Sequence, residues 1–220
     1  MAAVLDSTRA AAAAELKRAL RAIGRADADM ARAIKLAGPL PDRGRPPGFI
    51  TLLRSICFQQ LSLASAGAIW ARLEAAVSPL TPAALLALEE AAMRGFGFSR
   101  PKVRYARHLA EAIHRGHLDL DRLHELEDEL ALAELCKIKG IGRWTAEVYL
   151  LFALDRADIF PADDLALQVA MQQVKRLRKR PDRKRMLKLA EPWRPYRGVA
   201  ARVLWHYYRT VKAGSAGGVG

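Results

Sequence analysis

Residues 135–146 read LCKIKGIGRWTA, and this stretch decides the fold. Gly140 and Gly142 stand one residue apart between two stretches in which apolar residues recur with helical spacing. Because glycine adopts backbone conformations that other residues avoid, the pattern predicts a tight turn over residues 138–142. A helix is then predicted from Arg143 to about residue 153. The stretch therefore predicts two helices joined by a short glycine-containing hairpin.

The predicted start of the second helix offers a binding place for an anion. The first N–H groups of a helix have no partner within it, and the helix dipole makes this end positive. A phosphate can bind there without any side chain, and Lys139 and Arg143 add positive charge. A plain connection between two helices explains the turn equally well, so the turn alone does not decide between them.

Helical signals also dominate the rest of the chain. N-cap residues and apolar spacing predict helices over residues 6–23, 28–36, 49–57, 62–77, 81–93, 101–115, 164–180, 182–190 and 196–211, and one helix or two over residues 119–137. Residues 38–48, GPLPDRGRPPG, hold four prolines and three glycines, which indicates a linker between two lobes. Because alternating strand patterns and fixed-period repeats are absent from the sequence, the predicted class is all-α.

Composition narrows the class of partner. The chain has 220 residues, and its 36 Lys and Arg against 23 Asp and Glu give a net charge of +13. Such an excess predicts a polyanionic partner, nucleic acid ahead of an anionic membrane surface, although a merely soluble basic protein has the same composition. Two cysteines are too few for a four-thiolate cluster. Without an apolar run of about 18 residues or a secretory signal, we expect a cytoplasmic protein, nucleoid-associated if bacterial.

A second decisive stretch, residues 160–165, reads FPADDL. Asp163 and Asp164 follow a proline and open a predicted helix, where Asp is a favoured N-cap. The same position suits chemistry, because a helix N-terminus keeps a nearby carboxylate ionised. An ionised carboxylate can stabilise the oxocarbenium-like sugar that forms as an N-glycosidic bond breaks, or it can deprotonate a water. Capping and catalysis both remain open on these residues alone.

The hairpin followed by FPADDL resembles the helix–hairpin–helix (HhH-GPD) DNA glycosylase superfamily, over roughly residues 27–209. The superfamily includes endonuclease III and DNA-3-methyladenine glycosylase II. The resemblance implies that the hairpin contacts DNA through Lys139, Gly140, Gly142, Arg143 and Thr145.

The resemblance also implies a monovalent cation at the hairpin. Na⁺ or K⁺ would be held by the backbone carbonyls of Cys136, Ile138 and Ile141. No redox cofactor or catalytic metal is implied.

Within the family pattern the catalytic Asp precedes an apolar-x-apolar segment, and Asp164 precedes Leu165-Ala166-Leu167. Asp164 is therefore the expected catalytic residue. Family members with lyase activity carry a Lys two residues beyond the second hairpin glycine, to form a Schiff base with the sugar. Here that position is Trp144, which has no amine. The resemblance therefore points to a monofunctional glycosylase that acts on alkylated bases.

A glycosylase must extrude its target base and fill the gap in the stack. By position, Leu61 would enter that gap as an apolar wedge with Gln60 beside it, although Leu61 as a core residue is an equal alternative. Trp144, Trp205 and Tyr149 are the candidate walls of the base pocket, because aromatic faces attract cationic alkylated purines. Core packing is the alternative for each aromatic residue.

The resemblance implies two helical lobes with a central cleft and no β domain. We expect residues 48–157 to form the hairpin lobe, residues 1–47 with 158–213 the second lobe, and residues 214–220 a disordered tail. The expected function is hydrolysis of the N-glycosidic bond of alkylated purines, 3-methyladenine foremost, in duplex DNA by a monomer. The alternatives are a non-catalytic helix–hairpin–helix DNA-binding module and a glycosylase for another lesion, such as hypoxanthine.

One more feature carries no assigned role. Residues 175–188 contain nine Lys and Arg against one acid, Asp182. Such a run attracts phosphates in a sequence-independent and salt-sensitive manner, but it can equally be a solvated face.

Overall fold

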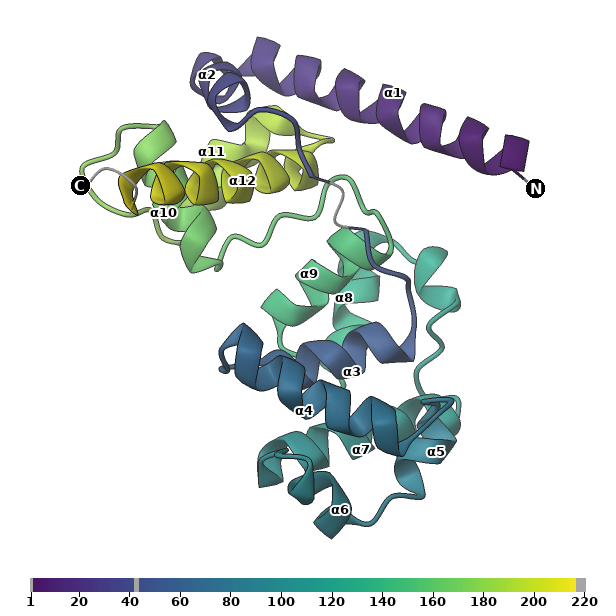
Figure 1. Ribbon diagram of the computed structural model, residues 1–220. Helices are drawn as coiled ribbons and strands as arrows, with labels where there is room; N and C mark the ends of the chain where they lie inside the picture. The colour runs from purple at the N-terminus through teal and green to yellow at the C-terminus, as the bar shows by residue number, and fades with distance from the viewer. Residues whose placement is uncertain (1, 42–43, 217–220) are drawn as a thin grey trace. The chain divides into compact units, whose positions relative to one another are not determined.

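The computed structural model describes residues 2–41 and 44–216 (Figure 1). Within these residues it contains helices and no strand, which confirms the all-α prediction. The chain forms two compact units, Arg43–Asp155 and Met1–Asp42 together with Arg156–Gly220. The expected lobe boundaries at residues 48 and 157 lie within a few positions of these. In the described part of the chain, no helix is both long and apolar enough to cross a membrane.

The unit Arg43–Asp155 is built around the apolar helix α3. Its elements are α3 (Phe49–Phe58), α4 (Leu63–Ala76), α5 (Pro82–Leu86), α6 (Glu90–Gly95), α7 (Arg100–His114), the 3-10 helix η1 (Arg122–His124), α8 (Asp128–Cys136) and α9 (Arg143–Ala153). Leu52, Leu53 and Ile56 of α3 are fully buried. They lie where α3 packs against α4, α7 and α9. Burial of each such side chain contributes about 1.5–3 kcal/mol, so α3 provides much of this core.

The start of α3 is fixed by α9. The N–H of Arg45 donates to the carbonyl of Phe152 at 2.9 Å, and the N–H of Gly48 donates to the hydroxyl of Tyr149, also at 2.9 Å. Gly48 has φ +117°, a conformation that favours glycine. These contacts tie the end of the proline-rich linker to the second helix of the hairpin.

The other unit is organised around the C-terminal helix. Its elements are α1 (Ala2–Ala26), α2 (Ala28–Ala37), α10 (Leu165–Val174), α11 (Arg183–Ala190), the 3-10 helix η2 (Glu191–Trp193) and α12 (Arg197–Ala216). Figure 1 shows α12 beside α10 and α2, and it packs against both. Leu167, Met171 and Leu204 are fully buried between these helices, and Ile23 of α1 and Trp193 complete the core.

A polar cluster joins three elements of this unit. Asp27 caps α2 by accepting the N–H of Met30, and its Oδ2 accepts the indole N–H of Trp193 at 2.9 Å. Lys175, the C-cap of α10, places its Nζ 2.5 Å from the same oxygen. Burial by itself raises the pKa of Asp27, but the hydrogen bonds from Lys175, the Met30 N–H and Trp193 outweigh it and hold the pKa below its usual value.

Four helix predictions needed correction. The helix expected over residues 6–23 is longer and runs from Ala2 to Ala26. The helix expected over residues 81–93 is two, α5 and α6, because Arg107 donates to the carbonyl of Leu88 and stabilises the break between them. The helix expected over 164–180 ends at Val174, where a tight turn with Arg176 at φ +50° takes up the last carbonyls. The last helix continues to Ala216, so residues 214–216 are helical rather than part of a disordered tail. Adding residues to an existing helix costs little. Residues 217–220 lie outside the described residues.

Candidate functional site

The hairpin is a turn that only glycine can close. α8 ends at Cys136 and α9 begins at Arg143, as the sequence predicts. The side chains of Ile138 and Ile141 are buried, and the N–H of Ile141 donates to the carbonyl of Ile138 at 2.9 Å. Gly140 has φ +93°, and a Cβ there would lie 2.3 Å from Cγ of Tyr105. Any side chain at this position would therefore displace α7.

Two neighbouring helices hold the turn in place. The N–H of Lys139 donates to Nδ1 of His108 on α7 at 3.2 Å. The side chain of Gln59, which ends α3, donates through Nε2 to the carbonyl of Gly140 at 2.9 Å. Gln59 and His108 were not singled out from the sequence, because contacts across 81 and 31 positions leave no local pattern. The turn is thus pre-organised.

The start of α9 fits an anion through its backbone. Gly142 is the N-cap, and no side chain in the described part of the chain caps the helix there. The N–H groups of its first turn have no acceptor within the helix, and the helix dipole makes this end positive. The side chain of Lys139 is exposed, whereas that of Thr145 is buried with its hydroxyl 3.5 Å from Gln59 Nε2. Thr145 can therefore offer an anion its backbone rather than its hydroxyl.

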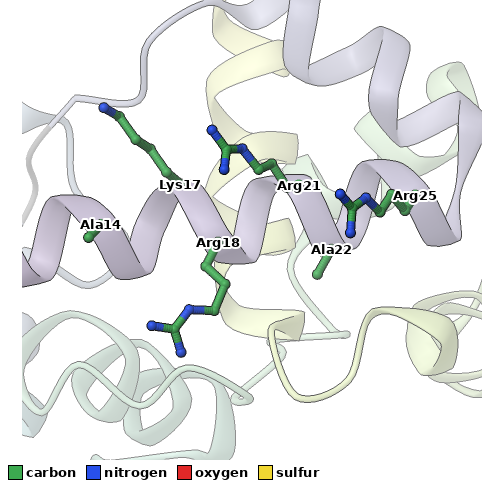
Figure 2. Close-up of a pocket in the computed structure, with 6 residues that line it drawn as sticks. All are labelled: Ala14, Lys17, Arg18, Arg21, Ala22 and Arg25. Atoms are coloured by element: carbon green, nitrogen blue, oxygen red, sulfur yellow. The ribbon is translucent and has the colours of Figure 1, made fainter.

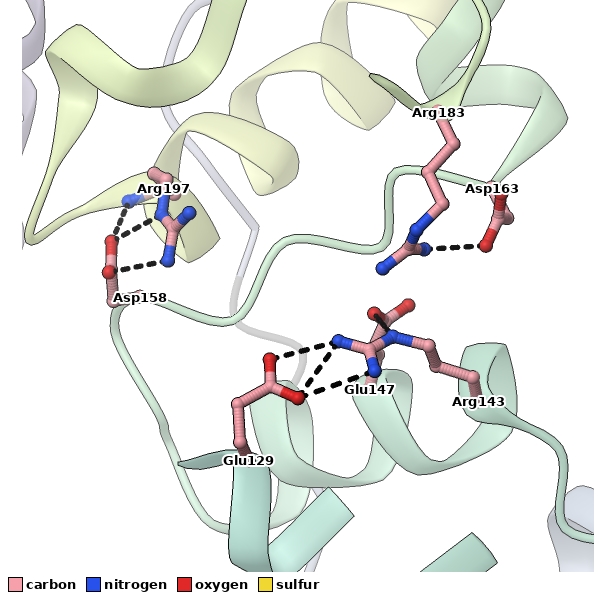
Figure 3. A network of polar contacts seen from close by, with 7 residues as sticks. All are labelled: Glu129, Arg143, Glu147, Asp158, Asp163, Arg183 and Arg197. Atoms are coloured by element: carbon pink, nitrogen blue, oxygen red, sulfur yellow. Dashed lines mark hydrogen bonds and ion pairs between the residues drawn. The ribbon is translucent and has the colours of Figure 1, made fainter. Parts of the chain in front are cut away.

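Arg143 has structural partners that the phosphate prediction did not include. Figure 3 shows its Nε donating to Glu147 at 2.9 Å and its Nη2 donating to Glu129 at 3.0 Å. The hydrogen bond to Glu129 is the main cause of a raised pKa of Arg143, and Glu147 adds to it against the effect of burial. Glu147 is only 2% exposed. Arg143 therefore links α8 to α9, and a phosphate would have to compete with two carboxylates for it.

The segment after α3 exposes apolar side chains. Gln60 is exposed and has φ +55°, which is uncommon for a residue other than glycine. Leu61 is 40% exposed, which argues against the alternative that it is a core residue. Leu63, the first residue of α4, is 81% exposed and was missed in the sequence. Its place directly after the Ser62 N-cap was the available signal.

Asp164 caps α10 and is held in a fixed orientation. Its Oδ1 accepts the N–H of Leu167 at 2.9 Å and the indole N–H of Trp205 at 2.9 Å. The carboxylate is half-exposed. The capping alternative is thus real, but it does not displace a chemical role, because the group also contacts a predicted pocket residue. The sequence suggested both residues without suggesting that they touch.

Ion pairs fix the loop that leads to Asp164. Figure 3 shows Asp158 bound by Arg197 through two nitrogens, at 2.9 and 2.7 Å, and Arg194 lies 2.7 Å from the same carboxylate. Asp163 pairs with Arg183 of α11 at 2.6 Å. Asp163 is therefore engaged on a side chain of its own unit, which leaves Asp164 as the capping carboxylate.

The predicted aromatic pocket residues have different environments. Trp144 is 44% exposed and Trp205 is half-exposed. Tyr149 is 2% exposed, its hydroxyl accepts the Gly48 N–H, and burial raises its pKa. Five positions along a helix correspond to a rotation of about 140°, so Tyr149 lies on a different face of α9 from the exposed Trp144 and is buried in its own unit. Val148, four positions on, shares the face of Trp144.

The predicted residues fall into two sets. Asp164 and Trp205 lie together in the unit that ends with α12. The hairpin, the Gln60–Leu61 segment and Trp144 belong to the unit Arg43–Asp155. Chemically, the first set offers a carboxylate oriented by the N–H edge of an indole ring, and the second offers backbone N–H donors for an anion.

The chain is similar to known proteins of one family. Residues 53–195 match the family described as "HhH-GPD superfamily base excision DNA repair protein". The chain is 34% identical over 186 residues to DNA-3-methyladenine glycosylase 1 of Schizosaccharomyces pombe, covering 81% of this chain and 82% of that protein.

Two solved structures extend the comparison. The S. pombe 3-methyladenine DNA glycosylase in complex with abasic DNA has a TM-score of 0.77 and 33% identity, covering 86% of this chain and 95% of that one. The DNA-3-methyladenine glycosidase of Bacillus halodurans has a TM-score of 0.81 and 32% identity, covering 89% and 91%. This chain therefore belongs to the HhH-GPD superfamily of base excision DNA repair proteins.

Proposed function

We propose that the chain is a monofunctional DNA glycosylase that hydrolyses the N-glycosidic bond of alkylated purines, of the 3-methyladenine type, in duplex DNA. Relatives that share about a third of its residues over most of their length are named for 3-methyladenine, which supports this substrate class. The observation that carries the proposal is Asp164, whose carboxylate is oriented by Leu167 and Trp205.

Asp164 would act on the sugar. As the bond between C1′ and the purine nitrogen breaks, its electron pair moves to the base and neutralises the positive charge of the alkylated purine. The sugar becomes an oxocarbenium-like cation, which the carboxylate stabilises electrostatically. A water then bonds to C1′ and gives up a proton, which Asp164 can accept. Because the cationic base is already a good leaving group, little acid catalysis of its departure is needed.

The hairpin would hold the DNA strand beside the lesion. A backbone phosphate fits the N–H groups at the start of α9, with Gly142 leaving the approach open and Lys139 adding charge. Leu61 would fill the space left by the extruded base, and its exposure supports this role.

A monovalent cation at the hairpin is part of the proposal. The carbonyls of Cys136, Ile138 and Ile141 are the expected donors, and oxygen donors suit Na⁺ and K⁺. The carbonyl of Ile138 already accepts the Ile141 N–H, but a carbonyl oxygen has a second lone pair for a cation. When bound, the cation would add positive charge beside the phosphate.

We expect base release without strand cleavage. A lyase step needs an amine that attacks C1′, and the position where such family members carry a Lys is Trp144. Trp144 is instead exposed, which suits stacking on a cationic base.

The test is an excision assay on a panel of duplexes that each carry one modified base. Free base and abasic sites should accumulate from duplexes with 3-methyladenine or another N-alkylated purine, and borohydride should trap no covalent complex. If hypoxanthine is the only base released, the proposed substrate class of alkylated purines is wrong. If the protein binds the duplexes tightly but releases no base from any of them, it is a non-catalytic DNA-binding module and not a glycosylase.

A further inference from the structure

The positive charge of the chain is concentrated in one unit. The unit Met1–Asp42 with Arg156–Gly220 holds 22 Lys and Arg against 10 Asp and Glu, a net charge of +12. The hairpin unit Arg43–Asp155 holds 14 against 13, a net charge of +1. If the hairpin were the whole of the DNA-binding surface, its unit would be expected to be the basic one. The charge therefore points to a second binding surface.

Residues 175–188 form that surface. Lys175 is drawn into the Asp27 cluster, and Arg183 pairs with Asp163. The seven remaining cations are all exposed and line one open hollow of about 1170 Å³. We name as the cation surface Arg176, Arg178, Lys179, Arg180, Lys184, Arg185 and Lys188.

The charges of the cation surface are not neutralised within the protein. In the part of the chain that the structure describes, none of the seven cations forms an ion pair. Among the described residues, Asp182 is the one acid that lines the hollow, and its Oδ1 caps α11 by accepting the N–H of Arg185 at 2.8 Å. Solvated faces of stable proteins usually interleave both signs of charge, which this surface does not.

The backbone of the surface is also unusual. Arg176 has φ +50° at the end of α10, a position where glycine is favoured and another residue costs about 1 kcal/mol. This turn redirects the chain so that Arg178, Lys179 and Arg180 project from one loop. Lys184 and Lys188 lie one helical turn apart on α11, so they share a face.

The cation surface lies close to the candidate catalytic residue. Asp164 and Lys175 cap opposite ends of α10, whose 10 residues span about 15 Å. The ion pair between Arg183 and Asp163 brings the start of α11 back beside Asp164. Phosphates of one strand follow each other at about 3.4 Å along the helix axis, so the surface is within reach of phosphates a few nucleotides from a lesion at Asp164.

We propose that the cation surface binds backbone phosphates of duplex DNA that flank the lesion, as a second DNA-binding surface separate from the hairpin. The inference rests on the proposed function, because it takes the same duplex as ligand. An anionic membrane fits less well, since a membrane-binding segment exposes apolar side chains. Here Pro181 and Met186 are buried, and the leucines of residues 175–189 are only partly exposed.

A matched control lies on α1 in the same unit. Figure 2 shows Lys17, Arg18, Arg21 and Arg25 along this helix. Arg18 pairs with Glu15, and the other three are exposed. Replacing Lys17, Arg21 and Arg25 by Gln removes the same charge as a triple change in the cation surface, from residues that line a different hollow.

The experiment measures the dissociation constant for an undamaged duplex between 50 and 200 mM salt. The loop variant is Arg178→Gln, Lys179→Gln, Arg180→Gln, and the α11 variant is Lys184→Gln, Arg185→Gln, Lys188→Gln. Each lost phosphate contact lowers the slope of log K against log salt by about 0.9. Either variant should therefore lower the slope by about 2 to 3 and weaken binding at least about 10-fold at low salt, while the α1 variant leaves the slope within about 0.5 of wild type.

A slope unchanged in both surface variants, or lowered equally by the α1 variant, would overturn the proposal. Binding to phosphatidylserine vesicles is measured for the same variants. If the surface variants lose vesicle binding but keep wild-type binding to the duplex, the proposal is also overturned. Thermal unfolding of each variant identifies one that fails to fold, and the other triple variant then decides. Base excision at saturating enzyme is measured separately and tests the proposed function. If excision is absent but the slopes change as expected, the proposed function fails and the DNA-binding role of the cation surface is kept. If excision is present but the slopes do not change, only the role of the cation surface fails.

Discussion

Asp164 caps α10 and is also the proposed catalytic residue, two roles that the sequence could not separate. As N-cap of α10 it is fixed by the Leu167 N–H, and the Trp205 indole holds the same oxygen. A capping carboxylate would do its structural work with the first bond alone. The second bond comes from a residue 41 positions away and orients the carboxylate at the N–H edge of an indole ring.

The contribution of that second bond can be measured. Trp205→Phe keeps an aromatic ring but removes the N–H that binds Asp164 Oδ1. A hydrogen bond to a charged group contributes about 1.5–3 kcal/mol, so we expect a loss of about 10-fold or more in single-turnover excision. Duplex affinity, measured in parallel, should change little. Wild-type excision by Trp205→Phe would show that the indole N–H does not position the carboxylate.

At the scale of elements, the hairpin depends on the approach of α7. Gly140 lies against Tyr105 at a backbone angle that favours glycine. Gly142 differs, because no described atom lies within 4 Å of a Cβ placed there. Two glycines that look alike in the sequence therefore meet different constraints.

This difference predicts unequal effects of alanine. Gly140→Ala should lower the free energy of unfolding by at least about 2 kcal/mol, since it combines backbone strain with displacement of Tyr105. Gly142→Ala should cost less than about 1 kcal/mol, the value of a poorer N-cap. Denaturant titration of both variants decides, and equal losses would contradict the assigned role of Tyr105.

The Asp27 cluster joins α2, α10 and η2 and gives the fold an acid-sensitive contact. The pKa of the Asp27 carboxyl group is lowered in the folded protein, so the unfolded chain binds a proton at Asp27 more tightly than the folded protein does. The stabilisation is present above the ordinary Asp pKa of about 3.9 and is lost as the pH falls through the lowered value.

Asp27→Asn should remove this pH dependence. The variant keeps a cap but leaves Lys175 without its nearer carboxylate, and we expect a loss of about 2 kcal/mol at pH 7. The difference from wild type should shrink as the pH falls below 4. A difference that stays constant between pH 7 and pH 3, measured by denaturant unfolding, would show that the charge of Asp27 does not stabilise the fold.

For the whole molecule, the sequence predicted local structure well but did not predict the contacts between distant residues. The helices, the hairpin and the capping position of Asp164 follow from glycine spacing, capping residues and helical periodicity within about a dozen residues. Contacts between separate elements could not be predicted from the sequence. Examples are the hydrogen bonds of Trp205 with Asp164, Gln59 with Gly140 and Arg143 with Glu129. The burial of Tyr149 could not be predicted either, because it depends on which face of α9 packs against the rest of its unit.

The distribution of charge is the feature of the whole molecule that sequence composition concealed. A net charge of +13 suggested a basic protein, but the hairpin unit is nearly neutral and the unit with Asp164 carries almost all of it. The unit that carries the candidate catalytic residue therefore also attracts the polyanion.

We propose that the negative charge of Asp164 drives base release. Asp164→Asn is nearly isosteric and keeps an oxygen to accept from Leu167 and Trp205, so fold and DNA binding should survive. Single-turnover release of an N-alkylated purine from duplex DNA should fall at least about 100-fold, while duplex affinity stays within about threefold. Release at the wild-type rate by Asp164→Asn would contradict the account.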